Sequence, residues 1–189
     1  MIKVNASEIK KYIERCKADK KFQLHDSTLN KLFSLYPKNN NLNEVLMKVC
    51  CLNVFYSTSI IKIEEIAKYI VSLNIDKRLQ AKDLTLVNEI ADKDRNGINR
   101  SVYSFASKYC SHHFEKDFPI YDSYVEKMLK ELNKQDNFSK FKTADLKDYL
   151  EFNRVLNDFR NYYNLKEFTL KELDMYLWSA GKEFFPKKF

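Results

Sequence analysis

Apolar residues recur every three or four positions along nearly the whole chain, which is the period of an amphipathic α-helix. Every strong period in the sequence is helical, so the pattern predicts an all-α fold. The predicted helices cover approximately residues 7–20, 26–36, 45–56, 63–71, 84–90, 102–110, 123–133, 143–163 and 169–180.

Two of these helices carry a start signal in the sequence. Ser123 with Glu126, and Thr169 with Glu172, fit the Ser/Thr-x-x-Glu capping box. In this motif each side chain accepts a hydrogen bond from a backbone N–H that the helix itself leaves unpaired. The sequence therefore predicts helix starts at these two positions.

Turn-forming residues are scarce, because the chain has only two glycines and three prolines. Hairpin-rich β folds need residues with positive φ in their turns, and the phosphate loops of Rossmann and P-loop proteins need several glycines. Neither class fits, so no nucleotide cofactor is expected. With 189 residues and 44% hydrophobic composition, one compact all-α domain over residues 1–189 is predicted.

The cysteines and histidines form no recognisable ligand pattern. There is no C-x-x-C pair, and the His spacings fit no zinc or iron–sulfur site. The cysteines are therefore expected to be reduced core thiols, and no metal or other cofactor is predicted. These residues are Cys16, Cys50, Cys51, Cys110, His25, His112 and His113.

Charge and hydropathy bear on the protein's location and partners. No apolar run approaches the roughly 20 residues of a membrane span, and the N-terminus lacks the apolar core of a signal peptide. We expect a cytoplasmic protein without membrane contact. The 33 basic and 26 acidic residues give a formal net charge of +7, which is compatible with a polyanionic partner such as DNA.

One segment differs from ordinary amphipathic helix. Residues 97–125 read GINRSVYSFASKYCSHHFEKDFPIYDSYV, a turn followed by an aromatic helix, a His-His loop and a Pro-Ile-Tyr-Asp helix entrance. Asp122 stands where first-turn N–H groups and the positive helix end stabilise a carboxylate. An ionised aspartate at this place is a candidate catalytic group.

This segment resembles the helix-hairpin-helix (HhH-GPD) base-excision DNA glycosylase superfamily, with the similar part at about residues 97–133. Residues 97–101 stand for the hairpin that grips a DNA backbone, residues 119–123 for the catalytic helix entrance, and residues 52–58 for part of the base pocket. The resemblance implies that Asp122 stabilises positive charge on the sugar. It implies a base pocket of Tyr56, Tyr103 and Phe105, and DNA-backbone contacts from Gly97, Asn99, Arg100 and Lys108.

Ser101 stands where lyase-competent members carry a Schiff-base lysine, so the resemblance implies at most a monofunctional glycosylase. An alternative function is a non-catalytic helical module that binds nucleic acid or protein. In that case Asp122 only begins a helix, and the aromatic residues belong to the core. A homodimer formed through apolar helix faces is compatible with both, and the oligomeric state stays open.

Overall fold

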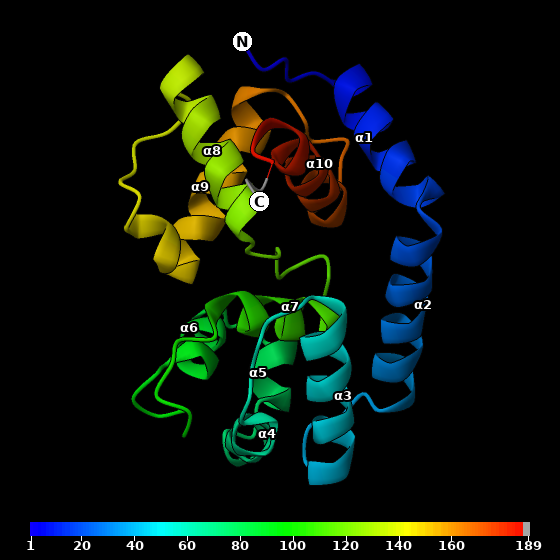
Figure 1. The fold of residues 1–189 in the computed structure, drawn as a ribbon. Coiled ribbons are helices and arrows are strands. Elements are labelled where there is room, and N and C mark those ends of the chain that lie inside the picture. The colour runs from blue at the N-terminus through cyan, green and yellow to red at the C-terminus, as the bar shows by residue number, and fades with distance from the viewer. Residues whose placement is uncertain (187–189) are drawn as a thin grey trace. The chain divides into compact units, whose positions relative to one another are not determined.

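The computed structural model describes residues 1–186, and within them the chain forms α-helices, one short 3-10 helix and no strand (Figure 1). Helix accounts for 66% of the residues, which confirms the predicted all-α fold. None of the helices in residues 1–186 has the length and apolar character needed to cross a membrane. The helices are α1 (Ala6–Ala18), α2 (Lys20–Leu35), α3 (Leu42–Phe55), α4 (Ile63–Ser72), α5 (Asp76–Gln80), α6 (Thr85–Ala91), α7 (Tyr103–His113), α8 (Ser123–Asp136), η1 (Asp145–Lys147), α9 (Tyr149–Tyr162) and α10 (Leu170–Phe184).

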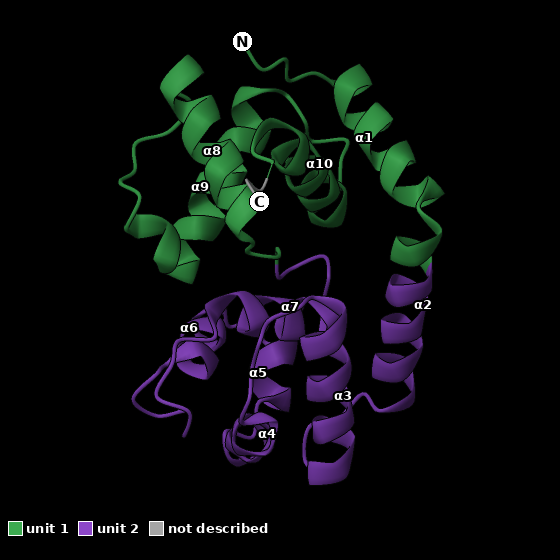
Figure 2. Ribbon diagram, viewed as in Figure 1, with its two compact units in different colours: residues 1–23, 119–189 green, residues 24–118 purple. Residues whose placement is uncertain are grey.

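The chain divides into two compact units, coloured separately in Figure 2. Unit 1 consists of residues 1–23 together with 119–189, and unit 2 is the continuous stretch 24–118. The segment expected to resemble a helix-hairpin-helix, 97–133, therefore begins in unit 2 and ends in unit 1. One domain over residues 1–189 stays a prediction, and the two units are described separately below.

Helix α7 is the central element of unit 2, since eight of its eleven residues are buried. Helices α3 and α6 pack against α7, and α3 also packs against α4. Val45, Val49 and Leu52 give α3 a fully buried stripe, and Ile66 and Ile70 do the same for α4. Burial of such stripes is what stabilises helices of this length, because short helices are marginal on their own.

In unit 1, helix α10 packs against both α1 and α8. Tyr12 of α1 meets Tyr176 of α10 edge to face, with ring centroids 5.6 Å apart. Gly181 lets α8 approach closely, because a Cβ there would lie 2.8 Å from Cβ of Tyr124 and 2.9 Å from its carbonyl oxygen. Residues 187–189, the end of the basic and aromatic C-terminal segment, lie outside the described residues.

The two predicted capping boxes have different outcomes. Thr169 and Glu172 form theirs, with each side chain accepting from the other's backbone N–H. The predicted box of Ser123 and Glu126 is wrong, because Asp122 is the N-cap of α8 and accepts from the N–H of Tyr124 at 2.9 Å. The carboxylate of Asp122, one position before Ser123, accepts a hydrogen bond from the first turn of α8. Glu126 has other partners.

Several helix boundaries also differ from the prediction. Helix α2 starts at Lys20 instead of residue 26, because the carboxylate of Asp19 accepts from two N–H groups of its first turn. Asp148 does the same for α9, so the expected helix from 143 begins only at Tyr149. Helix α7 continues to His113, through residues that were expected to form a loop. The short helix α5 was not predicted.

Candidate nucleic-acid interface

Residues 97–101 form a closed loop that is held by the buried side chain of Asn96. Its amide nitrogen donates to the carbonyl of Arg100 at 2.8 Å, and its amide oxygen accepts from the N–H of Ile98 at 3.1 Å. Gly97 and Asn99 adopt positive φ values of 75° and 53°. Glycine and asparagine are the residues that tolerate this conformation best, so the local sequence suits the loop.

Arg100 connects this loop to a second tight turn of unit 2. Its guanidinium donates to the carbonyl oxygen of Ser59 at 2.9 Å. Ser57 and Ser59 both have positive φ, 52° and 57°, which is costly for residues with a Cβ. Asn53 supports the turn, because its side chain bonds both the N–H and the carbonyl of Ile60 at 2.9 Å. The structure thus joins the segments near 52–58 and 97–101 that the sequence analysis selected.

The loop contains four backbone N–H groups without a hydrogen-bond acceptor in the described part of the chain. Gly97, Asn99, Arg100 and Ser101 are exposed, and within residues 1–186 their backbone N–H groups have no acceptor. The loop leads into α7, whose N-cap residue Val102 makes no capping hydrogen bond through its side chain. Successive N–H groups around left-handed residues form concavities that bind anions. Together with the exposed Arg100, this edge of unit 2 suits a phosphate group.

Tyr56 is the half-buried member of the predicted base pocket. Its hydroxyl lies 3.0 Å from Nε2 of His112, and Nζ of Lys108 lies 5.2 Å from its ring centroid. Lys108 is only 2% exposed, and its Nζ donates to Oγ of Ser104 at 2.6 Å. The expected contact between Lys108 and DNA phosphate is therefore not available in this conformation, because helix α7 turns that side chain inward.

The other two aromatic residues of the predicted pocket belong to the core of unit 2. Tyr103 is 8% exposed and Phe105 is 1% exposed. The ring of Phe105 packs 5.8 Å from that of Tyr109, centroid to centroid. A base flipped out of a helix would have to displace core packing to reach these rings. Tyr56 alone keeps a partly exposed ring.

Asp122 belongs to unit 1, whereas the other seven predicted site residues belong to unit 2. Its side chain is half-buried and caps α8 through the N–H of Tyr124. Next to it, the hydroxyl of Tyr121 donates to Glu126, and Lys147 donates to the same carboxylate at 2.7 Å. Burial raises the pKa of Glu126, but the hydrogen bonds from Lys147 and Tyr121 outweigh it, so the net shift is downward. These contacts explain why Glu126 does not complete a capping box.

A buried polar cluster in unit 2 was missed by the sequence analysis. The side-chain oxygen of Asn39 accepts from Nζ of Lys48 at 2.7 Å, from Nε2 of His113 at 3.1 Å and from the hydroxyl of Tyr109. Asp76 accepts from the amide nitrogen of Asn39 at 2.7 Å, which fixes the orientation of that amide. The side-chain oxygen of Asn39 can only accept hydrogen bonds, so His113 must carry its proton on Nε2. The only signal in the sequence was a lysine, Lys48, within the otherwise apolar stretch 45–52.

Burial shifts the ionisation of this cluster. It lowers the pKa of Lys48 to about 8, although the negative charge of Asp76 acts in the opposite direction. Burial also lowers the pKa of His113 to about 3, and the positive charge of Lys48 adds to this effect. A neutral His113 therefore belongs to the folded state at neutral pH. Within residues 1–186, no group of three or more His, Cys, Asp and Glu side chains is arranged to hold a metal ion.

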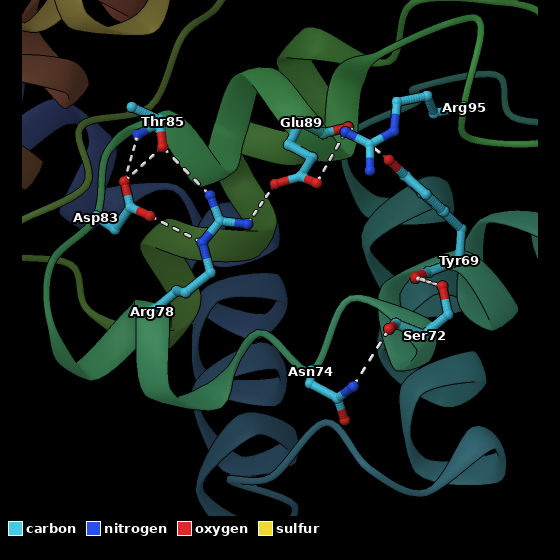
Figure 3. Close-up of polar contacts among 8 residues, drawn as sticks. All are labelled: Tyr69, Ser72, Asn74, Arg78, Asp83, Thr85, Glu89 and Arg95. Carbon is cyan, nitrogen blue, oxygen red and sulfur yellow. Dashed lines mark hydrogen bonds and ion pairs between the residues drawn. The ribbon is translucent and has the colours of Figure 1, made fainter.

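A second polar network in unit 2 pairs its arginines internally (Figure 3). Arg78 bonds Asp83 at 2.8 Å and also contacts Glu89. Arg95 bonds the other oxygen of Glu89 at 2.9 Å, and the hydroxyl of Tyr69 donates to the carbonyl of that residue. Two of the basic side chains of unit 2 are thus neutralised by neighbours, which leaves Arg100 as the better candidate for an external phosphate.

Comparison with known proteins identifies the family but no activity. The family model HI_0787_N, described as an N-terminal domain, matches residues 8–117. A Haemophilus influenzae protein named "Uncharacterized protein" is 48% identical over 147 residues, which cover 77% of this chain and 70% of the relative. No solved structure matches. The chain belongs to the HI_0787_N family, and the matched region contains every predicted site residue except Asp122.

Proposed function

We propose that this member of the HI_0787_N family is a non-catalytic helical module that binds DNA through the loop 97–101. The observations that carry the proposal are the exposed residues Gly97, Asn99, Arg100 and Ser101, whose backbone N–H groups have no acceptor within residues 1–186, and the exposed side chain of Arg100. Phosphate oxygens accept hydrogen bonds from such groups in many DNA complexes, and these contacts carry no base specificity. The formal net charge of the whole chain, +7, favours the same partner.

The absence of catalysis is proposed from the state of the expected pocket. Two of its three rings, Tyr103 and Phe105, are core residues, and Lys108 is buried with them. The carboxylate of Asp122 accepts a backbone hydrogen bond at a helix start, which is a sufficient structural role. Each residue thus has a packing or capping function that requires no substrate.

Base hydrolysis is the second candidate function, and one observation favours it. Asp122 is half-buried and not sealed in the core. In that case the carboxylate would stabilise the positive charge that develops on the sugar during cleavage of the glycosidic bond.

Binding can be tested with a fluorescein-labelled DNA duplex titrated at several salt concentrations. Arg100→Ala should weaken binding and reduce the slope of log K against log salt by about 0.9, the value for one lost phosphate contact. Lys31→Ala is the matched control, because Lys31 is an exposed residue of α2 in the same unit with no ion pair in the described part of the chain. Equal weakening by both variants, or by neither, would refute the assigned interface.

Catalysis is tested separately by incubating the protein with duplexes that carry different base lesions and measuring abasic sites. We expect none above the level of the Asp122→Asn variant. Base release that disappears in Asp122→Asn would overturn the non-catalytic assignment and establish the second candidate, while leaving the DNA contact at Arg100 intact.

A further inference from the structure

Unit 1 carries a basic and aromatic surface that lies outside the interface described above. The first 23 residues contain seven basic and three acidic side chains. Lys17, Lys20 and Lys21, at the end of α1 and the start of α2, are all exposed. None of the three forms an ion pair with any residue in 1–186. Their charges are therefore available to an external anion.

Two aromatic rings lie on the same surface. Trp178 and Lys182 are one turn apart on α10, and Nζ of Lys182 lies 4.0 Å from the Trp178 ring centroid. Phe22, the residue after Lys21, has its ring centroid 6.1 Å from that of Trp178. Both rings are half-buried. The buried positions of α10 are mostly on the opposite side, so packing against α1 and α8 leaves part of Trp178 accessible.

We propose that this surface, formed by Lys17, Lys21, Phe22, Trp178 and Lys182, binds single-stranded nucleic acid. Proteins that bind single strands without sequence preference combine cationic side chains along the backbone with aromatic rings on which bases stack. The lysines would contact phosphates, and the accessible part of the Trp178 ring would take a base. Two acidic residues, Glu14 and Asp19, also lie on this stretch; the carboxylate of Asp19 is engaged with the start of α2.

The burial of the rings favours a nucleic acid over a lipid surface. Membrane-binding aromatic residues insert into the interface between headgroups and acyl chains, so they must protrude from the protein. Trp178 and Phe22 are instead half-buried and contact each other. The proposal does not depend on the loop 97–101, because every residue it uses belongs to unit 1.

The single tryptophan of the chain provides a direct readout. We would titrate the full-length protein with an unmodified deoxythymidine oligonucleotide and follow the fluorescence of Trp178. Stacking predicts strong quenching that reverses with added salt. The double variant Lys17→Gln with Lys21→Gln should weaken binding severalfold and reduce the salt slope by about 1.4, which is the value for two single-strand phosphate contacts.

The controls separate this site from the other interface and from nonspecific binding. Lys31→Gln with Lys38→Gln removes two exposed lysines from unit 2 and should leave the quenching titration unchanged. Arg100→Ala should also leave it unchanged, whatever its effect on duplex binding. Equal quenching by heparin, or quenching by anionic vesicles but not by the oligonucleotide, would overturn the assignment. Unchanged affinity in the Lys17 and Lys21 variant would do the same.

Discussion

Acid should destabilise the protein in part through His113, and His113→Gln should remove that part of the pH dependence. The folded structure holds this imidazole neutral, with Nε2 donating to the oxygen of Asn39 at 3.1 Å. A second proton would place a charge beside Lys48, which donates to the same oxygen. A glutamine amide can still donate to Asn39 but does not titrate, so the substitution changes the ionisation and keeps the hydrogen bond.

The size of the effect follows from the two pKa values. The pKa of His113 is about 3 in the folded protein and 6.5 as the ordinary value. Between these values the unfolded chain binds more protons, so this contribution to stability is complete above about pH 6.5 and is lost as the pH falls towards 3. One pH unit corresponds to about 1.4 kcal/mol. The wild-type protein should therefore lose about 3 kcal/mol relative to His113→Gln between pH 6.5 and pH 4.

Urea unfolding of both proteins at several pH values between 7 and 4 measures this difference. Carboxylates that titrate in the same range are present in both proteins, so their effects cancel in the comparison. His25→Gln is a suitable control, because His25 stacks on Phe55 with centroids 4.2 Å apart and lies outside the buried cluster. Parallel stability curves for the wild-type protein and His113→Gln would refute the reasoning.

Three further changes test other contacts. Gly181→Ala should destabilise unit 1 by about 1–3 kcal/mol, since its new Cβ meets the backbone and Cβ of Tyr124; thermal unfolding measures this. Asp122→Asn should keep the cap of α8 and change the denaturation midpoint little, whereas Asp122→Ala should cost about 1 kcal/mol; equal effects would contradict a capping role. The pKa of Lys48 is lowered from 10.5 to about 8, so between these pH values the lysine is protonated in the unfolded chain and neutral in the folded protein. The wild-type protein should therefore become more stable as the pH rises from 8 to 10.5. Lys48→Met should abolish this rise. Denaturant unfolding at pH 7.5 and 10 shows whether that rise exists.

The helical period of the sequence was enough to predict the fold class and most helices, because each helix buries an apolar stripe of its own. Helix starts were predicted less well. Thr169 and Glu172 satisfy each other within four residues, so their box is a local property. Glu126 instead bonds Lys147, twenty-one residues later, and this contact cannot be read from the motif alone. A sequence motif thus predicts contacts between neighbouring residues, but whether the contacts form also depends on partners that are distant in the sequence.

The candidate site shows the same limit. The resemblance implied that Lys108 contacts a DNA backbone, which requires a side chain at the surface, where lysine usually lies. Helix α7 is central in unit 2, and Ser104, one turn earlier, satisfies the buried ammonium. The helix also extends past its predicted end, where His113 packs edge-on against Phe33 with centroids 4.8 Å apart. The exposed residues Gly97, Asn99 and Arg100 lie in an irregular loop as expected, because turn residues determine their conformation locally.

The two units differ in how their parts of the chain are connected. Unit 1 is discontinuous, and its N-terminal part is held by distant residues: Arg15 bonds Glu183, and the backbone of Ile2 exchanges two hydrogen bonds with Gln135. Unit 2 is a single stretch, so its contacts join residues that are much closer in the sequence. Boundaries between domains often fall in linkers rich in proline, glycine or polar residues. No proline or glycine lies near residue 23, whereas Pro119 is the first residue after unit 2. The family match ends at 117, one residue before the end of unit 2.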